Sequence, residues 1–169
     1  MNSTAKRLID LLNLQKHTEG GYFAETYRSD EIFKSGYFPS RYSGDRRIST
    51  SIFFLLEGVD FSAFHKLKSD EIWHFYSGSE MKLYTIDKKG ILYDYTLGNN
   101  FENGSAFQIS VKSGQWLAAE LIDKKSFALV GCTVSPGFEY EDFELGKSSE
   151  LVKLFPEHGK IIERFTRII

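Results

Sequence analysis

Eight short apolar segments follow one another between Ser49 and Val134, with only a few residues separating each from the next. Each has the length and the aromatic and branched composition of a β-strand, and the gaps hold the Gly, Ser, Asp and Lys residues typical of turns. The segments cover residues 49–56, 60–67, 71–77, 80–86, 91–97, 106–111, 115–121 and 126–134. Because no helical pattern lies between them, the chain is predicted to form an antiparallel β-sandwich or β-barrel.

Helical patterns are confined to the two ends of the chain. Residues 4–14 place their leucines and one isoleucine on a single stripe, and residues 148–166 contain a second helical region. At 169 residues the chain is long enough to bury its own core without disulfides. We therefore expect one domain over residues 1–169, with a barrel core at about residues 19–145 and a helix near each end.

Two stretches lie between the first helix and the strand block. Residues 22–29, "YFAETYRS", alternate in polarity, which predicts one more strand with Glu25 and Tyr27 on the same face. Residues 29–47 are polar and interrupted by Gly and Pro, which predicts a long excursion from the barrel.

Two of the predicted strands are apolar on both faces. In "SIFFLL" (residues 51–56) and "FALVGCTV" (residues 127–134), neither set of alternate residues is polar enough to face water. An outer layer must therefore cover them, either a second subunit or the terminal helices. This pattern favours a homo-oligomer.

The charge pattern excludes two classes of partner. The chain has 21 Lys and Arg against 23 Asp and Glu, a formal net charge of −2, and no block of like charge. Neither nucleic acid nor an anionic membrane surface is expected to bind it. The single cysteine, Cys132, lies in an apolar run and indicates a packing role in a reducing compartment, and no targeting or membrane-spanning segment is visible. We expect a cytoplasmic protein.

The stretch "FHKLKSDEIWHF", residues 64–75, contains the strongest candidate site. Two strands joined at a tight turn would bring His65 and Glu71 to a shared face, with Trp73 beside Glu71 and His74 pointing the opposite way. An imidazole that titrates near neutrality and is held by a carboxylate suits acid–base chemistry. The alternative is that His65 only hydrogen-bonds inside a polar barrel centre. We favour function because burying a carboxylate without a task costs free energy.

A metal site needs three or four converging ligands. His17 and His158 lie in the terminal regions with no apparent route to His65 and Glu71, so the residues predict no metal and no cofactor. Cys132 has no base at a suggestive spacing, and neither a nucleophile elbow nor a nucleotide-binding glycine loop is present.

Further polar and aromatic side chains fall on strands that should face the same cavity. Together they predict a pocket with ring surfaces and a few hydrogen-bonding groups, which suits a small polar ligand. These expected binding residues are Glu25, Thr50, Trp73, Trp116 and Glu120, with Tyr27 as a candidate second acid.

The spacing of Gly58, His65, Leu67, Glu71 and Gly78 resembles the first signature of the cupin superfamily, with Leu67 where metal-binding cupins carry a second His. The position of their third metal-binding His falls near Leu117, so that His is absent too. The stretches "TEGGYFAETYRS", "TSIFFLL", "FSAFHKLKSDEIWHFYSG" and "ALVGCTVSPGFEYEDFEL" resemble the fifth cupin family, a domain of unknown function, in the same order. Ala24 and Lys66 depart from that family, which often has Arg at both positions.

The resemblance implies an all-β (mainly) fold, a double-stranded β-helix or jelly-roll barrel, and usually a homodimer, but no particular reaction. Cupins include metal-free, RmlC-like sugar-nucleotide epimerases that use a His–carboxylate pair, metal-dependent enzymes, and plain binding proteins. Our preferred hypothesis is a protein that binds a small polar metabolite, such as a sugar or sugar nucleotide. In an isomerase- or epimerase-like reaction, His65 would transfer the proton and Glu71 would orient it. A ligand-binding or sensory protein without turnover, and a metal-dependent cupin enzyme, stay open as alternatives.

Overall fold

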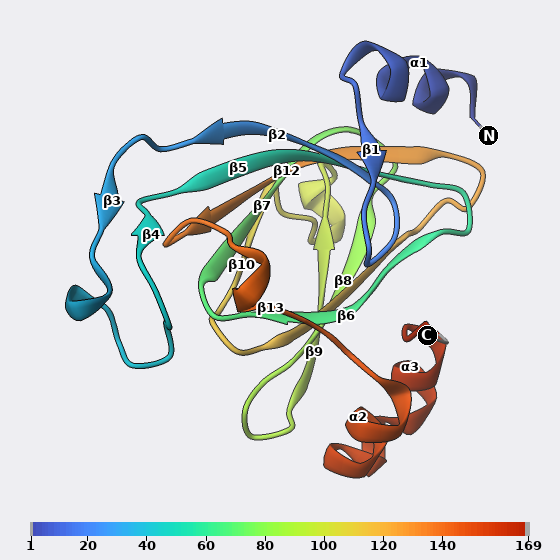
Figure 1. The fold of residues 1–169 in the computed structure, drawn as a ribbon. Coiled ribbons are helices and arrows are strands. Elements are labelled where there is room, and N and C mark those ends of the chain that lie inside the picture. Colours follow the sequence, from blue (N-terminus) through green and yellow to red (C-terminus); the bar gives the residue numbers. More distant parts are fainter. Residues whose placement is uncertain (1, 168–169) are drawn as a thin grey trace.

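The computed structural model describes residues 2–167, and in them two antiparallel sheets pack face to face (Figure 1). The first sheet has the order β1 (Gln15–Lys16), β2 (Tyr22–Arg28), β5 (Thr50–Glu57), β12 (Phe127–Ser135), β7 (Asp70–Gly78) and β10 (Gln108–Val111). The second has the order β13 (Phe143–Leu145), β6 (Phe61–Leu67), β11 (Trp116–Leu121), β8 (Met81–Ile86) and β9 (Leu92–Leu97). Neighbours in sequence often lie in different sheets, so the chain passes back and forth between the two layers.

The eight strands predicted between residues 49 and 134 are confirmed, with ends that differ by at most two residues. Their turns carry glycines where the backbone needs a positive φ, for example Gly58 at +63° and Gly114 at +79°. The predicted strand at residues 22–29 is β2. The pattern missed β1 and β13 because two or three residues are too short to show a period.

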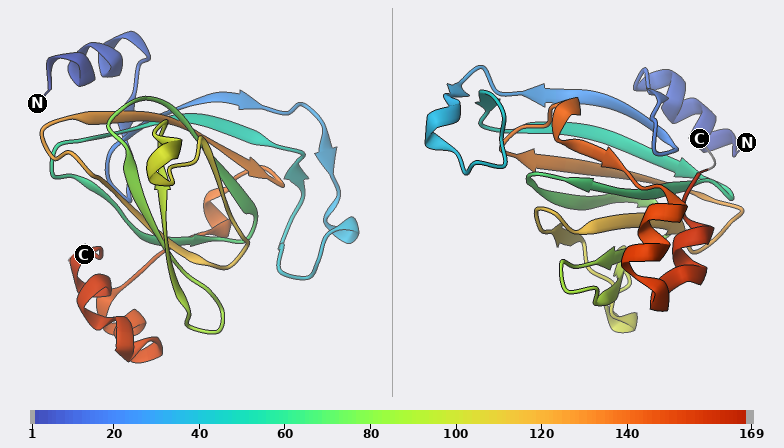
Figure 2. Two further views of the ribbon diagram at one scale, coloured as in Figure 1. Left: turned by 180° about the vertical axis from the view of Figure 1, so that it is seen from behind. Right: turned by 60° about the horizontal axis from the view of Figure 1, so that its bottom comes forward.

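The excursion at residues 29–47 forms a small arm rather than a loop without structure. It contains β3 (Ile32–Phe33), a 3-10 turn η1 (Ser35–Tyr37) and β4 (Arg46–Arg47), which pairs with β3. This arm projects from one end of the sheets (Figure 2). Its base is anchored where Arg46 meets Asp142 in the 3-10 turn η3 (Tyr140–Asp142).

Three short helices cover parts of the outer faces. The helix α1 (Ser3–Leu11), capped by the Asn2 side chain, packs on the first sheet, where Ala5 contacts the cluster of Leu55 and Leu129. The helices α2 (Ser148–Leu154) and α3 (Gly159–Arg164) pack on the second sheet. The remaining 3-10 turns are η2 (Phe101–Asn103) and η4 (Pro156–His158). None of the helices within residues 2–167 combines the length and the hydropathy that crossing a bilayer requires.

The main core fills the space between the two sheets, and it leaves a cavity towards one end. Phe54 and Val130 from the first sheet meet Leu83 and Leu117 from the second. The outer faces of β5 and β12, which were expected to be covered by helices or a second subunit, are covered in part by α1. Tyr76 on the outer face of β7 stays 51% exposed. A homodimer that covers this face stays a prediction.

Candidate functional site

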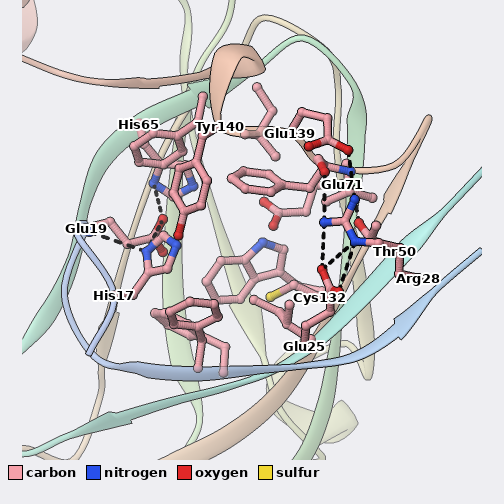
Figure 3. Close-up of a pocket in the computed structure, with 18 residues that line it drawn as sticks. His17, Glu19, Glu25, Arg28, Thr50, His65, Glu71, Cys132, Glu139 and Tyr140 are labelled. Atoms are coloured by element: carbon pink, nitrogen blue, oxygen red, sulfur yellow. Dashed lines mark hydrogen bonds and ion pairs between the residues drawn. The ribbon is translucent and has the colours of Figure 1, made fainter. Parts of the chain in front are cut away.

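A cavity of about 110 Å³ lies between the sheets beneath the segment that follows β12 (Figure 3). Its aromatic walls are Phe23, Phe54, Trp73, Phe138, Tyr140 and Phe143. Its polar lining residues are His17, Glu19, Glu25, Arg28, Thr50, His65, Glu71 and Glu139. A space of this size admits several waters or part of a small ligand, and its mixture of rings with a few polar groups is typical of a binding site.

His65 reaches the cavity from β6, because alternate residues of this strand face inward. Its side chain is 3% exposed, and its ring stacks on Phe143 with centroids 5.6 Å apart. Nδ1 lies 2.8 Å from the backbone oxygen of Ala63, which can only accept a hydrogen bond. Nδ1 must therefore carry the proton, and Nε2 is left as the nitrogen able to accept one.

Glu19 is the carboxylate that holds both imidazoles. Its Oε2 lies 3.3 Å from His17 Nδ1 and 3.4 Å from His65 Nδ1, and Ser62 Oγ donates to Oε1 at 2.8 Å. Burial raises the pKa of Glu19, but the charge of His65 and the hydrogen bonds from His17 and Ser62 outweigh burial and leave this pKa below its ordinary value. Burial lowers the pKa of His17, and Glu19 more than reverses it, so that this pKa is raised.

The expectation that His17 has no route to the site is wrong. The chain reverses at Gly20 and Gly21, which have φ values of +121° and +67°, and this turn brings His17 and Glu19 inside. The amide of Ala63 fixes the turn by donating to the Glu19 carbonyl at 2.9 Å. A paired glycine directly after a His and a Glu was the available signal, because such a turn lets neighbouring side chains enter a barrel.

Glu71 and Trp73 reach the same cavity from β7, as predicted. However, the carboxylate that orients His65 is Glu19 and not Glu71. Burial raises the pKa of Glu71, and the opposing charge of His65 is too weak to reverse it. The indole of Trp73 lies close enough to act to lower this pKa too, although its Nε1 forms no hydrogen bond with any of residues 2–167. Glu71 and Trp73 both line the cavity.

Glu25 and Thr50 also line the cavity, as predicted, and Arg28 lies with them. Arg28 donates from Nη2 to Glu25 Oε2 at 2.8 Å and from Nη1 to Glu139 Oε1 at 2.8 Å. Thr50 Oγ1 accepts from the amide of Phe138 at 2.9 Å and so fixes the segment over the cavity. Figure 3 shows this group across the cavity from His17, Glu19 and His65. Arg28 and Glu139 were missed because their pairing joins segments far apart in sequence.

Three predicted site residues lie outside the cavity. The pairing of β2 with β5 shifts between Glu25 and Tyr27, and this bulge turns Tyr27 outward, where it is 54% exposed. Trp116 and Glu120 share a face of β11 as expected, but it is the outer face. Trp116 packs in the cluster beneath α2 and α3, and Glu120 pairs with Lys124 and Arg164.

His74 also points away from the cavity, as its place on β7 predicts. Its Nε2 lies 3.2 Å from Thr133 Oγ1, and its Nδ1 lies 2.9 Å from Gln108 Nε2. Both contacts are on the outer face of the first sheet, so His74 belongs to that surface.

The donor atoms do not fit the metal site of metal-binding cupins. Within residues 2–167, no group of three or more His, Cys, Asp and Glu side chains is arranged to hold an ion. Leu67 lines the cavity beside His65, and Leu117 packs in the core. Cys132 also lines the cavity, but burial raises the pKa of its thiol, with the nearby negative charges adding to the effect, which does not suit a nucleophile.

Known proteins share this architecture. The structure of protein SO0799 from Shewanella oneidensis matches with a TM-score of 0.86 and 33% identity, over 100% of this chain and 99% of that one. The uncharacterized protein YML079W of Saccharomyces cerevisiae is 29% identical over 160 residues, 89% of this chain and 79% of the yeast protein. A Klebsiella pneumoniae protein with a double-stranded β-helix domain is 13% identical, with a TM-score of 0.50 over 79% of this chain and 90% of that one. That last likeness concerns the fold alone.

The family comparison agrees with the resemblance found in the sequence. The family described as "Cupin superfamily (DUF985)" matches residues 6–146, and the predicted double-stranded β-helix with short terminal helices is confirmed. A shared fold and uncharacterized relatives assign no reaction. The chain belongs to the DUF985 family of the cupin superfamily.

Proposed function

We propose that this cupin binds a small polar, sugar-like metabolite in the cavity and transfers a proton on it without a metal, as an isomerase or epimerase does. One observation carries the proposal. His65 Nδ1 is held by the Ala63 carbonyl and lies near Glu19, so the free Nε2 belongs to a buried imidazole in the wall of the cavity. A base held in this way is ready to accept a carbon-bound proton from a ligand.

The two carboxylates suit different roles because their pKa values are shifted in opposite directions. Glu19 has a lowered pKa, stays ionised and stabilises the His65 imidazolium that forms when the proton is taken. Glu71 has a raised pKa, so of the two carboxylates it is the one better able to exchange a proton with a polar group of the ligand. Tyr27 does not suit that role, because its side chain lies on the surface, outside the cavity.

A deuterium-exchange assay tests the proposal before the product is known. We would incubate the protein with a panel of aldoses, ketoses and their amino derivatives in D2O and follow loss of carbon-bound protons by NMR. His65→Asn is expected to lower the exchange rate by about 10²- to 10⁴-fold while the far-UV circular dichroism stays unchanged. Tyr27→Phe is the matched control and should exchange at the wild-type rate. Equal rates in the wild type and His65→Asn would remove His65 from the mechanism.

A binding or sensory protein without turnover is the second candidate. The Arg28 group and the six aromatic walls can hold a ligand without any proton transfer. A ligand that raises the melting temperature yet exchanges no proton would favour this candidate.

A further inference from the structure

We infer that the ligand of this cavity is a small amine, of which a 2-amino sugar is the model case: its ammonium group pairs with Glu71. This inference rests on the proposed function and names its ligand class. It is carried by the charges that line the cavity, by the buried carboxylate of Glu71, which has no ion pair among residues 2–167, and by the rings around it.

The lining residues disfavour an anionic ligand. They include four carboxylates, on Glu19, Glu25, Glu71 and Glu139, against one guanidinium, on Arg28, and two imidazoles, on His17 and His65, that both lie at Glu19. A phosphate or carboxylate entering this space would meet a negative field and would need free donors.

Those donors are already engaged. The guanidinium of Arg28 donates through Nε and Nη2 to Glu25, and through Nη1 to Glu139. Its Nη2 also donates to the carbonyl of Phe138 at 3.4 Å. An anion would have to displace one of the two carboxylates, whereas a cation or a neutral ligand would not. A sugar nucleotide is therefore a poor candidate, and a neutral or cationic ligand is a better one.

Glu71 favours the cationic ligand. Its residue is 8% exposed, and among residues 2–167 its carboxylate has no ion pair within 4.0 Å. By contrast, Glu19 is held by two imidazoles and a hydroxyl. A buried carboxylate without a partner is destabilising. A ligand with an ammonium group would form the ion pair that Glu71 lacks within the protein, and this would favour its binding.

Trp73 does not replace the missing ion pair. Glu71 and Trp73 are two residues apart on β7 and face the same side. The indole is 1% exposed and acts to lower the pKa of Glu71, but its Nε1 forms no hydrogen bond with any of residues 2–167. Because an indole carries no charge, a cationic group on the ligand is still the partner that Glu71 lacks.

The aromatic walls suit a cation as well. The rings of Phe54 and Trp73 lie edge to face with centroids 5.5 Å apart, and Phe143 closes another side of the cavity. Aromatic faces attract an ammonium group most strongly where water is excluded.

Calorimetric titration of the full chain at pH 7 tests the inference with matched ligands. The probes are D-glucosamine against D-glucose, ethanolamine against ethylene glycol, and glucose 6-phosphate as the anion. Each amine is expected to bind roughly 10- to 100-fold more tightly than its hydroxyl counterpart. Glu71→Gln, which keeps the shape and removes the charge, should abolish that preference. Glu144→Gln is the control, because Glu144 pairs with Lys66 outside the cavity.

The outcomes separate the inference from the proposed function. Equal affinity for glucosamine and glucose would overturn the amine and leave a sugar-binding cavity in place. A preference for amines that persists in Glu71→Gln would overturn the pairing with Glu71. Binding of glucose 6-phosphate alone would overturn the inference, and absence of binding by every probe would overturn it together with the sugar-like ligand of the proposed function.

Discussion

Two buried charged groups in this protein are satisfied to very different degrees. Arg46 is 1% exposed, and it donates to both oxygens of Asp142 at 2.6 and 2.7 Å and to the carbonyl of Asp45 at 2.8 Å. Lys68 adds a contact to Asp142 at 3.2 Å. Glu71 is 8% exposed and has no such partner within the described residues. The fully paired Arg46 and Asp142 connect the arm to the segment over the cavity. The unpaired Glu71 faces the cavity itself. A buried charge whose partners are complete serves structure, and one left open points to a ligand.

Breaking the Arg46–Asp142 pair should lower the free energy of unfolding more than the other substitutions do. Asp142→Ala leaves the Arg46 guanidinium buried without its main partner, and we expect the free energy of unfolding to fall by about 3–5 kcal/mol. Urea denaturation followed by circular dichroism measures the change. Glu144→Ala, which breaks an exposed pair with Lys66, is the control and should cost less than about 1 kcal/mol. If the two losses were equal, the Arg46–Asp142 pair would not anchor the arm.

Removing the charge of Glu19 should cause the second-largest loss in the free energy of unfolding. Glu19→Gln replaces charge-assisted hydrogen bonds by neutral ones, so we expect a loss of about 1–3 kcal/mol at pH 7. The pKa of Glu19 is lowered in the folded protein, so its contribution is present above the ordinary value of 4.5 and is lost as the pH falls through the folded pKa. The difference between wild type and variant should therefore shrink in acid. Unfolding curves from pH 3 to pH 8 measure it, and a difference that grows in acid would contradict the assignment.

Glu71→Gln should change the free energy of unfolding least, and it should raise the stability instead of lowering it. Because the pKa of Glu71 is raised by burial, the folded protein favours the protonated carboxyl, and the associated stability is present below the ordinary value of 4.5 and is lost as the pH rises through the folded pKa. Gln does not ionise, so the variant does not lose stability as the pH rises. We therefore expect it to be about 1 kcal/mol more stable than wild type at pH 8 and equal to it in acid. Thermal unfolding at both pH values measures this. A variant less stable than wild type at pH 8 would mean that Glu71 has a partner after all.

Much of the site could be predicted from local pattern. His65, Glu71 and Trp73 were predicted to face one interior because side chains alternate along a strand, and they do. The same rule placed Trp116 and Glu120 on a common face, which is correct, but it could not say which face was inner. Both faces of β11 are covered, one by the core and the other by α2 and α3. The polarity of the residues therefore does not distinguish the inner face of this strand from the outer one.

The parts of the site that were missed depend on long-range contacts. His17 and Glu19 enter the cavity through a glycine turn whose direction is held by β6, and a bulge against β5 turns Tyr27 away from its predicted place. Arg28 meets Glu139 across 111 residues of sequence. No periodicity within one strand encodes such meetings.

By itself, then, the sequence determined the strands, their turns, the terminal helices and which side chains share a face, because these follow from backbone sterics and from the two-residue repeat of a strand. The tertiary structure alone decided which faces look inward, which carboxylate holds His65, and which buried charge is left without a partner. Those outcomes depend on how distant segments pack, since the free energy of a buried charge is set by neighbours that folding brings to it.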